Sequence, residues 1–343
     1  MRQTRILSTP QARIPHVIVL LLHQELLPDD FMLNLLAFFG RRATVVLAMG
    51  VFLGFAFPAL SSLVRPWLAL FIVGPLVIAL MRIDWSDLWM WARRWKLIVV
   101  LTFWMMVASP LLVFLSLQGT GVAPGVIAGI VLMAAAPPIV SAAAIAMFLG
   151  LDGAIIVVTT VASMWLVPLL LPPMALNLLD LHIDISLWVF MGRLALFVAI
   201  AFAGAWIGRR LLGPARLTRA APHLDGAAVL SMLLFVIGVF VGVTEMTMAM
   251  PQHVLTATLL AYLFNIGLQV ISTAMFWRLG RRVALSVGLM AGNCNMGLVL
   301  VSLGGRADAD TAMFFAVGQF PMYTLPMLLT PLYRRLLRGE LKQ

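Results

Sequence analysis

Long apolar stretches, each followed by a short polar segment, repeat along this 343-residue chain. An α-helix needs roughly 20 mainly apolar residues to cross the hydrocarbon core of a bilayer. The pattern therefore predicts an all-α membrane protein with ten transmembrane helices. The ten stretches cover residues 43–60, 66–82, 96–117, 122–149, 153–178, 186–208, 226–245, 253–277, 283–303 and 311–333.

Two of these stretches contain residues that interrupt a helix. Pro137 and Pro138 fall inside the fourth stretch, and Gly292 and Gly297 enclose a polar segment inside the ninth. Unpaired backbone groups are costly in lipid, so a broken helix persists at membrane depth only against protein or a water-filled cavity. Matched breaks in the two halves of a chain are typical of a transporter's binding site.

The stretches divide the chain into two halves of five, with a seam near residues 178–186. An odd number of spans per half inserts the second half upside down, which predicts an inverted repeat. The segment 211–225, with its Gly213-Pro214 pair, is expected to be a loop between the sixth and seventh spans. The expected organisation is an N-terminal cytoplasmic extension at 1–42, a first repeat at 43–180, a second repeat at 181–335 and a basic tail at 336–343.

Composition and charge agree with this interpretation. Hydrophobic residues make up 63% of the chain and charged residues 10%, whereas soluble domains carry about 25% charged residues. Most of the arginines and lysines behind the net charge of +10 lie in alternate segments between spans, on the side that also holds both termini. This positive-inside asymmetry predicts a multi-pass protein of the cell membrane with cytoplasmic termini. The charge orients the chain and does not indicate a nucleic-acid partner.

The N-terminal extension allows two interpretations. Phe31–Phe39 could form an amphipathic helix at the membrane interface, or translation could begin at Met32 with residues 1–31 not native. The apolar run from His16 to Leu22 is too short for the hydrophobic core of a usual secretory signal.

Polar residues in the ninth stretch are the first candidates for a binding site, because polar groups at membrane depth are costly and usually functional. Asn293, Cys294 and Asn295 lie in the interruption itself. The asparagine amides could bind substrate beside the positive dipole end of the following half-helix. Alternatively, the asparagines only satisfy the broken backbone.

Other polar residues lie one turn apart on further stretches. Thr160 and Ser163 share a face of the fifth stretch, and they either line a site or bond back to their own helix. Asn265 and Gln269 share a face of the eighth, a spacing that commonly joins helices, and the alternative is that Asn265 supports the substrate-binding asparagines. Gln319, on the tenth stretch, is expected to line the cavity.

Three charged residues near span ends are expected to have structural roles. Asp152 is expected to cap the fifth helix rather than to relay protons. Arg193 is expected to extend toward the lipid headgroups, with an entrance charge for anions as the alternative. Glu245 is expected at the interface.

No pattern indicates an enzyme, a cofactor or a bound metal ion. The five histidines are expected in terminal or loop segments, without the spacing of paired ligands. No Walker or dinucleotide-binding glycine pattern occurs. Cys294 is the only cysteine, which excludes an intramolecular disulfide.

Several short motifs, in order, resemble the bile acid:sodium symporter family. Ala134-Ala135-Ala136-Pro137, Asp152, Pro168, Asn295-Met296-Gly297-Leu298, Leu53-Gly54, Pro58, Met81-Arg82-Ile83-Asp84 and Arg93-Arg94 are the residues concerned. The resemblance extends over about residues 40–335. It implies a transporter of organic anions, usually coupled to sodium, in which a panel of spans 1, 2, 6 and 7 faces a core of spans 3–5 and 8–10. Spans 4 and 9 would cross at their breaks.

Most residues that the resemblance assigns to sodium binding are replaced here. The family's Ser-Asn pair corresponds to Ala142-Ala143, with Ser141 as the one neighbouring substitute. The glutamate and glutamine of its ninth span correspond to Met290 and Cys294. Losing the carboxylate removes the charge that offsets the desolvation of a small cation. Sodium coupling through those sites is therefore not expected.

The expected function is a secondary transporter or facilitator of small organic anions that works by alternating access. One alternative is a ligand-sensing membrane protein that has lost transport. Another is a metalloid oxyanion efflux permease, although the useful cysteine of such permeases lies in the fourth span and Cys294 lies in the ninth. The substrate, the direction of transport and the oligomeric state stay open.

Overall fold

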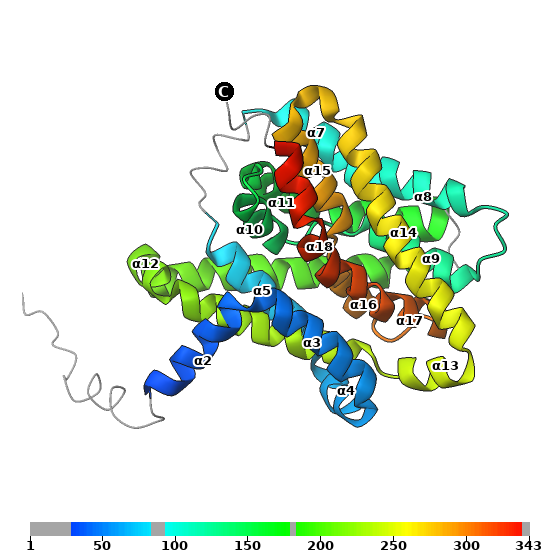
Figure 1. Ribbon diagram of the computed structural model, residues 1–343, viewed down its shortest axis with the longest axis horizontal. Coiled ribbons are helices and arrows are strands. Elements are labelled where there is room, and N and C mark those ends of the chain that lie inside the picture. Colours follow the sequence, from blue (N-terminus) through cyan, green and yellow to red (C-terminus); the bar gives the residue numbers. More distant parts are fainter. Residues whose placement is uncertain (1–28, 84–92, 179–182, 338–343) are drawn as a thin grey trace, which may run out of the picture.

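The computed structural model describes residues 29–83, 93–178 and 183–337, and this part of the chain is almost entirely helical (Figure 1). No strand occurs among the described residues, although two of them form an isolated β-bridge. Within these described ranges, six helices are long and apolar enough to cross a membrane, or seven if the bent pair 32–41 and 45–56 counts as one span. The described helices therefore fit a multi-pass membrane protein, as the hydropathy pattern predicts.

The helices follow one another closely along the chain. The first half contains α2 (Asp29–Arg41), α3 (Ala43–Ala56), α4 (Pro58–Val64), the 3₁₀-helix η1 (Arg65–Trp67), α5 (Leu68–Met81), α7 (Trp95–Phe103), the π-helix η2 (Trp104–Ala108), α8 (Ser109–Leu117), α9 (Pro124–Ala135), α10 (Ser141–Phe148), α11 (Gly153–Pro173) and the π-helix η3 (Met174–Leu178). The second half contains α12 (Leu187–Val239), α13 (Val243–Ala249), α14 (Pro251–Met275), the 3₁₀-helix η4 (Trp277–Leu279), α15 (Arg281–Gly292), α16 (Met296–Leu303), α17 (Ala309–Val317) and α18 (Gln319–Leu337).

The predicted spans differ from these helices mainly where a span is divided. The fourth predicted span forms α9 and α10, and the ninth forms α15 and α16, each with non-helical residues between the two pieces. These four helices are each too short to cross a membrane alone. The ten-span topology and the inverted repeat therefore stay predictions.

The predicted loop at residues 211–225 is wrong, because this segment is helical. Two helices, which share the label α12, meet at Gly213, the one residue of this segment outside the helical conformation, with φ 72° and ψ 160°. Glycine adopts positive φ without steric cost, and Pro214 suits the first turn of the helix that follows. The two arms of α12 turn back on each other at this point (Figure 1). The chain therefore reverses direction at a single glycine instead of through the predicted loop.

α2 forms where the amphipathic helix at Phe31–Phe39 is predicted. It packs against the second arm of α12, where the backbone of Leu36 touches Gly226 so closely that a side chain on the glycine would not fit. Met32 and Phe38 are exposed. The helix is thus anchored to protein on one side, and its location at a membrane interface stays a prediction.

The second arm of α12 packs closely against α3. A Cβ atom at Gly54 would lie 3.0 Å from both Cα and the carbonyl oxygen of Ile237, so the backbones of α3 and α12 almost touch. Small residues permit this approach between membrane helices. Phe240, directly after α12, packs edge to face on Phe55 of α3 and Phe320 of α18. This packing fixes the α12 arm that borders the candidate site.

We expect Gly54→Ala to lower the stability of the folded protein by about 1–3 kcal/mol, because the added methyl group must push two backbones apart. Gly74→Ala is the matched control, since its nearest neighbour would be Ser231 Oγ at 3.9 Å. The measurement is the unfolding midpoint of each variant in detergent. Equal midpoints for the two variants would contradict the close approach of α3 and α12.

Candidate functional site

The two helix breaks lie against each other. Pro138 and Cys294 form an antiparallel β-bridge. The Ile139 amide donates to the Asn293 carbonyl at 2.9 Å, and the Asn295 amide donates to the Pro137 carbonyl at 2.7 Å. The two breaks therefore form hydrogen bonds with each other through backbone groups that have no partner within their own helices. The structure breaks both helices where the sequence predicts and brings the breaks together.

Different local chemistry ends each helix. Proline lacks an amide hydrogen, and Pro137 forces the preceding Ala136 into an extended conformation, with ψ 148°. No proline occurs in the second break. There Asn295 Oδ1 accepts from the Leu298 amide at 3.2 Å and caps the N-terminus of α16. Asn293 Nδ2 donates to the Leu289 carbonyl at 2.8 Å near the end of α15.

Both asparagines thus form hydrogen bonds to the backbone of the break, as the alternative interpretation expects. One of their side-chain oxygens, however, has no such bond. Asn293 Oδ1 is buried and has no hydrogen-bond partner among the described residues. Gln319 repeats this arrangement, because its Nε2 donates to the Phe315 carbonyl at 3.0 Å while its buried Oε1 has no partner there. Each amide therefore has a structural contact and an unused acceptor.

Asn265 supports the second break from outside. Its Nδ2 donates to the Gly292 carbonyl at 2.6 Å, and its Oδ1 accepts from Gln269 Nε2 at 2.7 Å. Tyr333 Oη donates to Gln269 Oε1 at 2.8 Å. This chain joins α14, α15 and α18, which favours the helix-joining interpretation of Asn265. It does not line the cavity described below.

Thr160 and Ser163 lie on α11, and both residues are fully buried. Neither hydroxyl group has a hydrogen-bond partner among the described residues, so the alternative of a bond back to their own helix is not observed. Neither residue lines the cavity.

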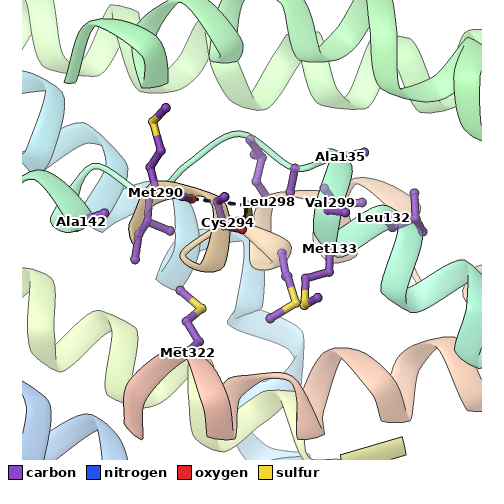
Figure 2. Close-up of a cluster of buried hydrophobic side chains, with 14 of the residues drawn as sticks. Leu132, Met133, Ala135, Ala142, Met290, Cys294, Leu298, Val299 and Met322 are labelled. Atoms are coloured by element: carbon purple, nitrogen blue, oxygen red, sulfur yellow. Dashed lines mark hydrogen bonds between the residues drawn. The ribbon is translucent and has the colours of Figure 1, made fainter. Parts of the chain in front are cut away.

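Cys294 lies in an apolar cluster rather than at an open surface. Figure 2 shows it beside Met290 and Leu298, with Met133 from α9 and Met322 from α18 close by. Its Sγ is directed toward the Ala291 carbonyl, at 3.4 Å. The cysteine is 3% exposed and does not line the cavity.

A cavity of about 620 Å³ opens beside the two breaks. Its wall is mainly apolar and comes from α2, α3, α5, α10, α11, α18, the second arm of α12 and both breaks. Four of the predicted site residues, Ser141, Asn293, Asn295 and Gln319, are in this wall, together with Gly297. A mainly apolar pocket of this size with a few polar groups is typical of small-molecule sites.

Arg82 and Asp225 carry the only charges among the described residues that line the cavity, and sequence reasoning did not assign them to the site. Their side chains form an ion pair between the end of α5 and the second arm of α12. Partial burial lowers the pKa of the Arg82 guanidinium from its ordinary value. No sequence signal links the two, since they belong to separate spans and meet only through helix packing.

The charged residues near span ends have defined contacts. Asp152 Oδ1 accepts from the Ile155 amide at 3.2 Å, so the predicted cap of α11 is confirmed. Arg193 Nη1 donates to the Leu303 carbonyl at 3.1 Å. This arginine is thus bonded to the end of α16, a protein contact that the lipid-headgroup interpretation did not foresee. Glu245 is exposed on α13.

The expectation that every histidine lies in a terminal or loop segment is wrong for two of them. His223 lies in α12 and His253 in α14, where its Nε2 is 2.8 Å from Asp310 Oδ1. His16, His23 and His182 lie outside the described residues. Among the described residues, no group of three histidine, cysteine or acidic side chains could hold a metal ion.

Comparison of the chain with models of known protein families and with curated proteins finds no match. Function is therefore inferred from the geometry of the breaks and the cavity, together with the short sequence motifs that resemble the symporter family.

We expect Asn265→Leu to destabilise the protein by about 1–3 kcal/mol, because it leaves the buried Gly292 carbonyl and Gln269 amide without partners. Thr258→Val is the control on the same helix, since the Thr258 hydroxyl bonds only to the Val254 carbonyl of its own turn. Thermal unfolding in detergent measures both variants. An Asn265→Leu midpoint equal to that of the control would show that the network does not stabilise the break.

Proposed function

We propose that this chain is a secondary transporter or facilitator of small organic anions, and a divergent relative of the bile acid:sodium symporter family. The observation that supports the proposal most is the contact between two broken helices in the wall of one cavity. Non-helical backbone at membrane depth is tolerated where it lines such a cavity. Transporters place their binding sites at breaks of this kind.

The electrostatics of the breaks favour an anion. Ser141 begins α10 and Asn295 caps α16, and both residues line the cavity. The N-terminal ends of two half-helices therefore border the same space. Each end carries a partial positive charge from the aligned peptide dipoles of its helix, which favours a negatively charged group nearby.

The positive-inside pattern gives the cavity a direction. With ten spans and cytoplasmic termini, the end of α5 at Arg82 faces the cytoplasm, so the cavity would be open to that side. Arg193 would then join the first arm of α12 to α16 on the outer side, through the Leu303 carbonyl. We infer an inward-open conformation in which the outer side is closed by protein contacts.

Sodium has no evident role in the proposed cycle. Met290 and Ala142, which replace oxygen-bearing residues of the family, lie in the apolar cluster around Cys294 (Figure 2). An apolar surrounding gives a small cation no ligands in exchange for its water. A flux assay in proteoliposomes separates a transporter from a ligand-sensing protein, because a sensor binds the anion without moving it.

Asn295→Leu should remove transport, with at least a tenfold loss of initial uptake of an organic anion into proteoliposomes. The change deletes both the α16 cap and a polar group of the cavity wall, each worth about 1 kcal/mol or more. Asn177→Leu, at an exposed position of η3, is the control. Uptake at the control level by correctly inserted Asn295→Leu protein would reject the site.

Replacing sodium by potassium on both sides of the membrane should change the initial uptake rate by less than about twofold, because Met290 replaces the carboxylate that would offset the desolvation of a sodium ion at the family's site. The comparison uses the same proteoliposomes at constant ionic strength. A steep sodium dependence would contradict the interpretation of Met290 and Ala143.

A further inference from the structure

The ion pair between Arg82 and Asp225 lies in the wall of the cavity, where every other described residue is uncharged. The two side chains are 37% and 46% exposed. Water therefore reaches both groups, and the pair can open without moving an isolated charge into an apolar interior. A charged group of an entering molecule can reach the same guanidinium.

Arg82 is held in place by contacts that do not involve Asp225. Arg209, on the first arm of α12, donates through Nη1 to the Met81 carbonyl at 2.8 Å and to the Ile83 carbonyl at 2.6 Å. These carbonyls flank Arg82 at the end of α5. Arg209 thus fixes the backbone on both sides of Arg82, the point from which the Arg82 side chain reaches the cavity wall.

Asp225 is positioned independently by α2. A Cβ atom at Gly40 would lie 3.2 Å from the Asp225 Cβ, and the neighbouring Gly226 touches the backbone of Leu36. Gly40 itself lines the cavity. The carboxylate is therefore part of a rigid edge, next to a guanidinium that it neutralises.

We propose that Arg82 selects negatively charged passengers and that Asp225 is a built-in competitor, which pairs with Arg82 while the cavity holds no anion. This inference rests on the proposed function and names the residue that confers its preference for anions. A carboxylate or sulfonate has the planar or tripod arrangement of oxygens that accepts the paired N–H groups of a guanidinium. Exchange of one carboxylate for another at an exposed pair is nearly balanced in energy, so binding remains reversible.

A purely structural ion pair would have a different effect. It would tie α5 to α12, and removing either partner would alter stability without changing which molecules bind. The two roles are separated by comparing ligands of equal shape and different charge. Naphthalene-2-sulfonate is a permanent anion, and naphthalene-2-sulfonamide is its neutral analogue.

The experiment measures the dissociation constants of both compounds for the full-length protein in nanodiscs. We expect the wild type to bind the sulfonate at least tenfold more tightly than the sulfonamide. Arg82→Gln should reduce this preference to less than twofold. Asp225→Asn should strengthen sulfonate binding several-fold and leave sulfonamide binding unchanged. Arg65→Gln, which changes an exposed arginine outside the cavity wall, should keep the wild-type preference.

Arg209→Gln tests the positioning role and should weaken the preference for the sulfonate while leaving sulfonamide binding in place. A uniform loss of both ligands in this variant would show only a structural role for Arg209.

The outcomes distinguish this inference from the proposed function. Failure of the wild type to bind either compound would overturn both the organic-anion site and the role of Arg82. Wild-type selectivity that survives in Arg82→Gln would overturn the role of Arg82 and leave the proposed function intact. If Arg82→Gln does not fold, Asp225→Asn decides, because sulfonate binding no tighter than in the wild type would overturn the competitor role.

Discussion

The arrangement of the helices at the site depends on one constraint, the pairing of backbone groups where two helices are interrupted. A helix end inside a membrane leaves amides and carbonyls that lipid cannot satisfy. Here the residues around Pro138 and Cys294 pair with each other through two backbone hydrogen bonds. Neither break could be stable in this form without the other. Two segments far apart in the chain are thus required to meet, and the cavity lies beside their contact.

The same constraint explains why the polar side chains near the breaks have different roles. Asn295 caps a half-helix, and Asn265 donates to the Gly292 carbonyl. Both side chains therefore form hydrogen bonds with backbone groups at the break. Only Asn295 also lines the cavity. Charge, in contrast, enters the cavity wall through Arg82 and Asp225, on helices that pack across from the breaks. The site combines a backbone feature from one group of helices with an ion pair from another.

Much of this fold could be predicted from the sequence, and the limits have physical causes. Pro137 and Pro138 predict the first helix break, because proline cannot continue a helix. The asparagines between Gly292 and Gly297 predict the second helix break. The pairing of Arg82 with Asp225 could not be predicted, since helix packing alone brings them together. The loop expected at 211–225 was wrong, because its prolines and charges suggest a loop, whereas the segment after the turn at Gly213 is helical and packs against α2.

The contact between the breaks can be tested directly with the one native cysteine. The two hydrogen bonds of the bridge join the neighbours of residues 138 and 294, not these two residues themselves. In an antiparallel pair of this non-hydrogen-bonded kind, the two Cα atoms lie about 4.5 Å apart. A disulfide accepts that separation. In Pro138→Cys, mild oxidation in the membrane should therefore link residue 138 to Cys294 within one chain, as measured by intact-protein mass and loss of free thiol. Ala128→Cys, about two turns before the end of α9, should not link to Cys294. Failure of folded Pro138→Cys to form the disulfide would contradict the meeting of the two breaks.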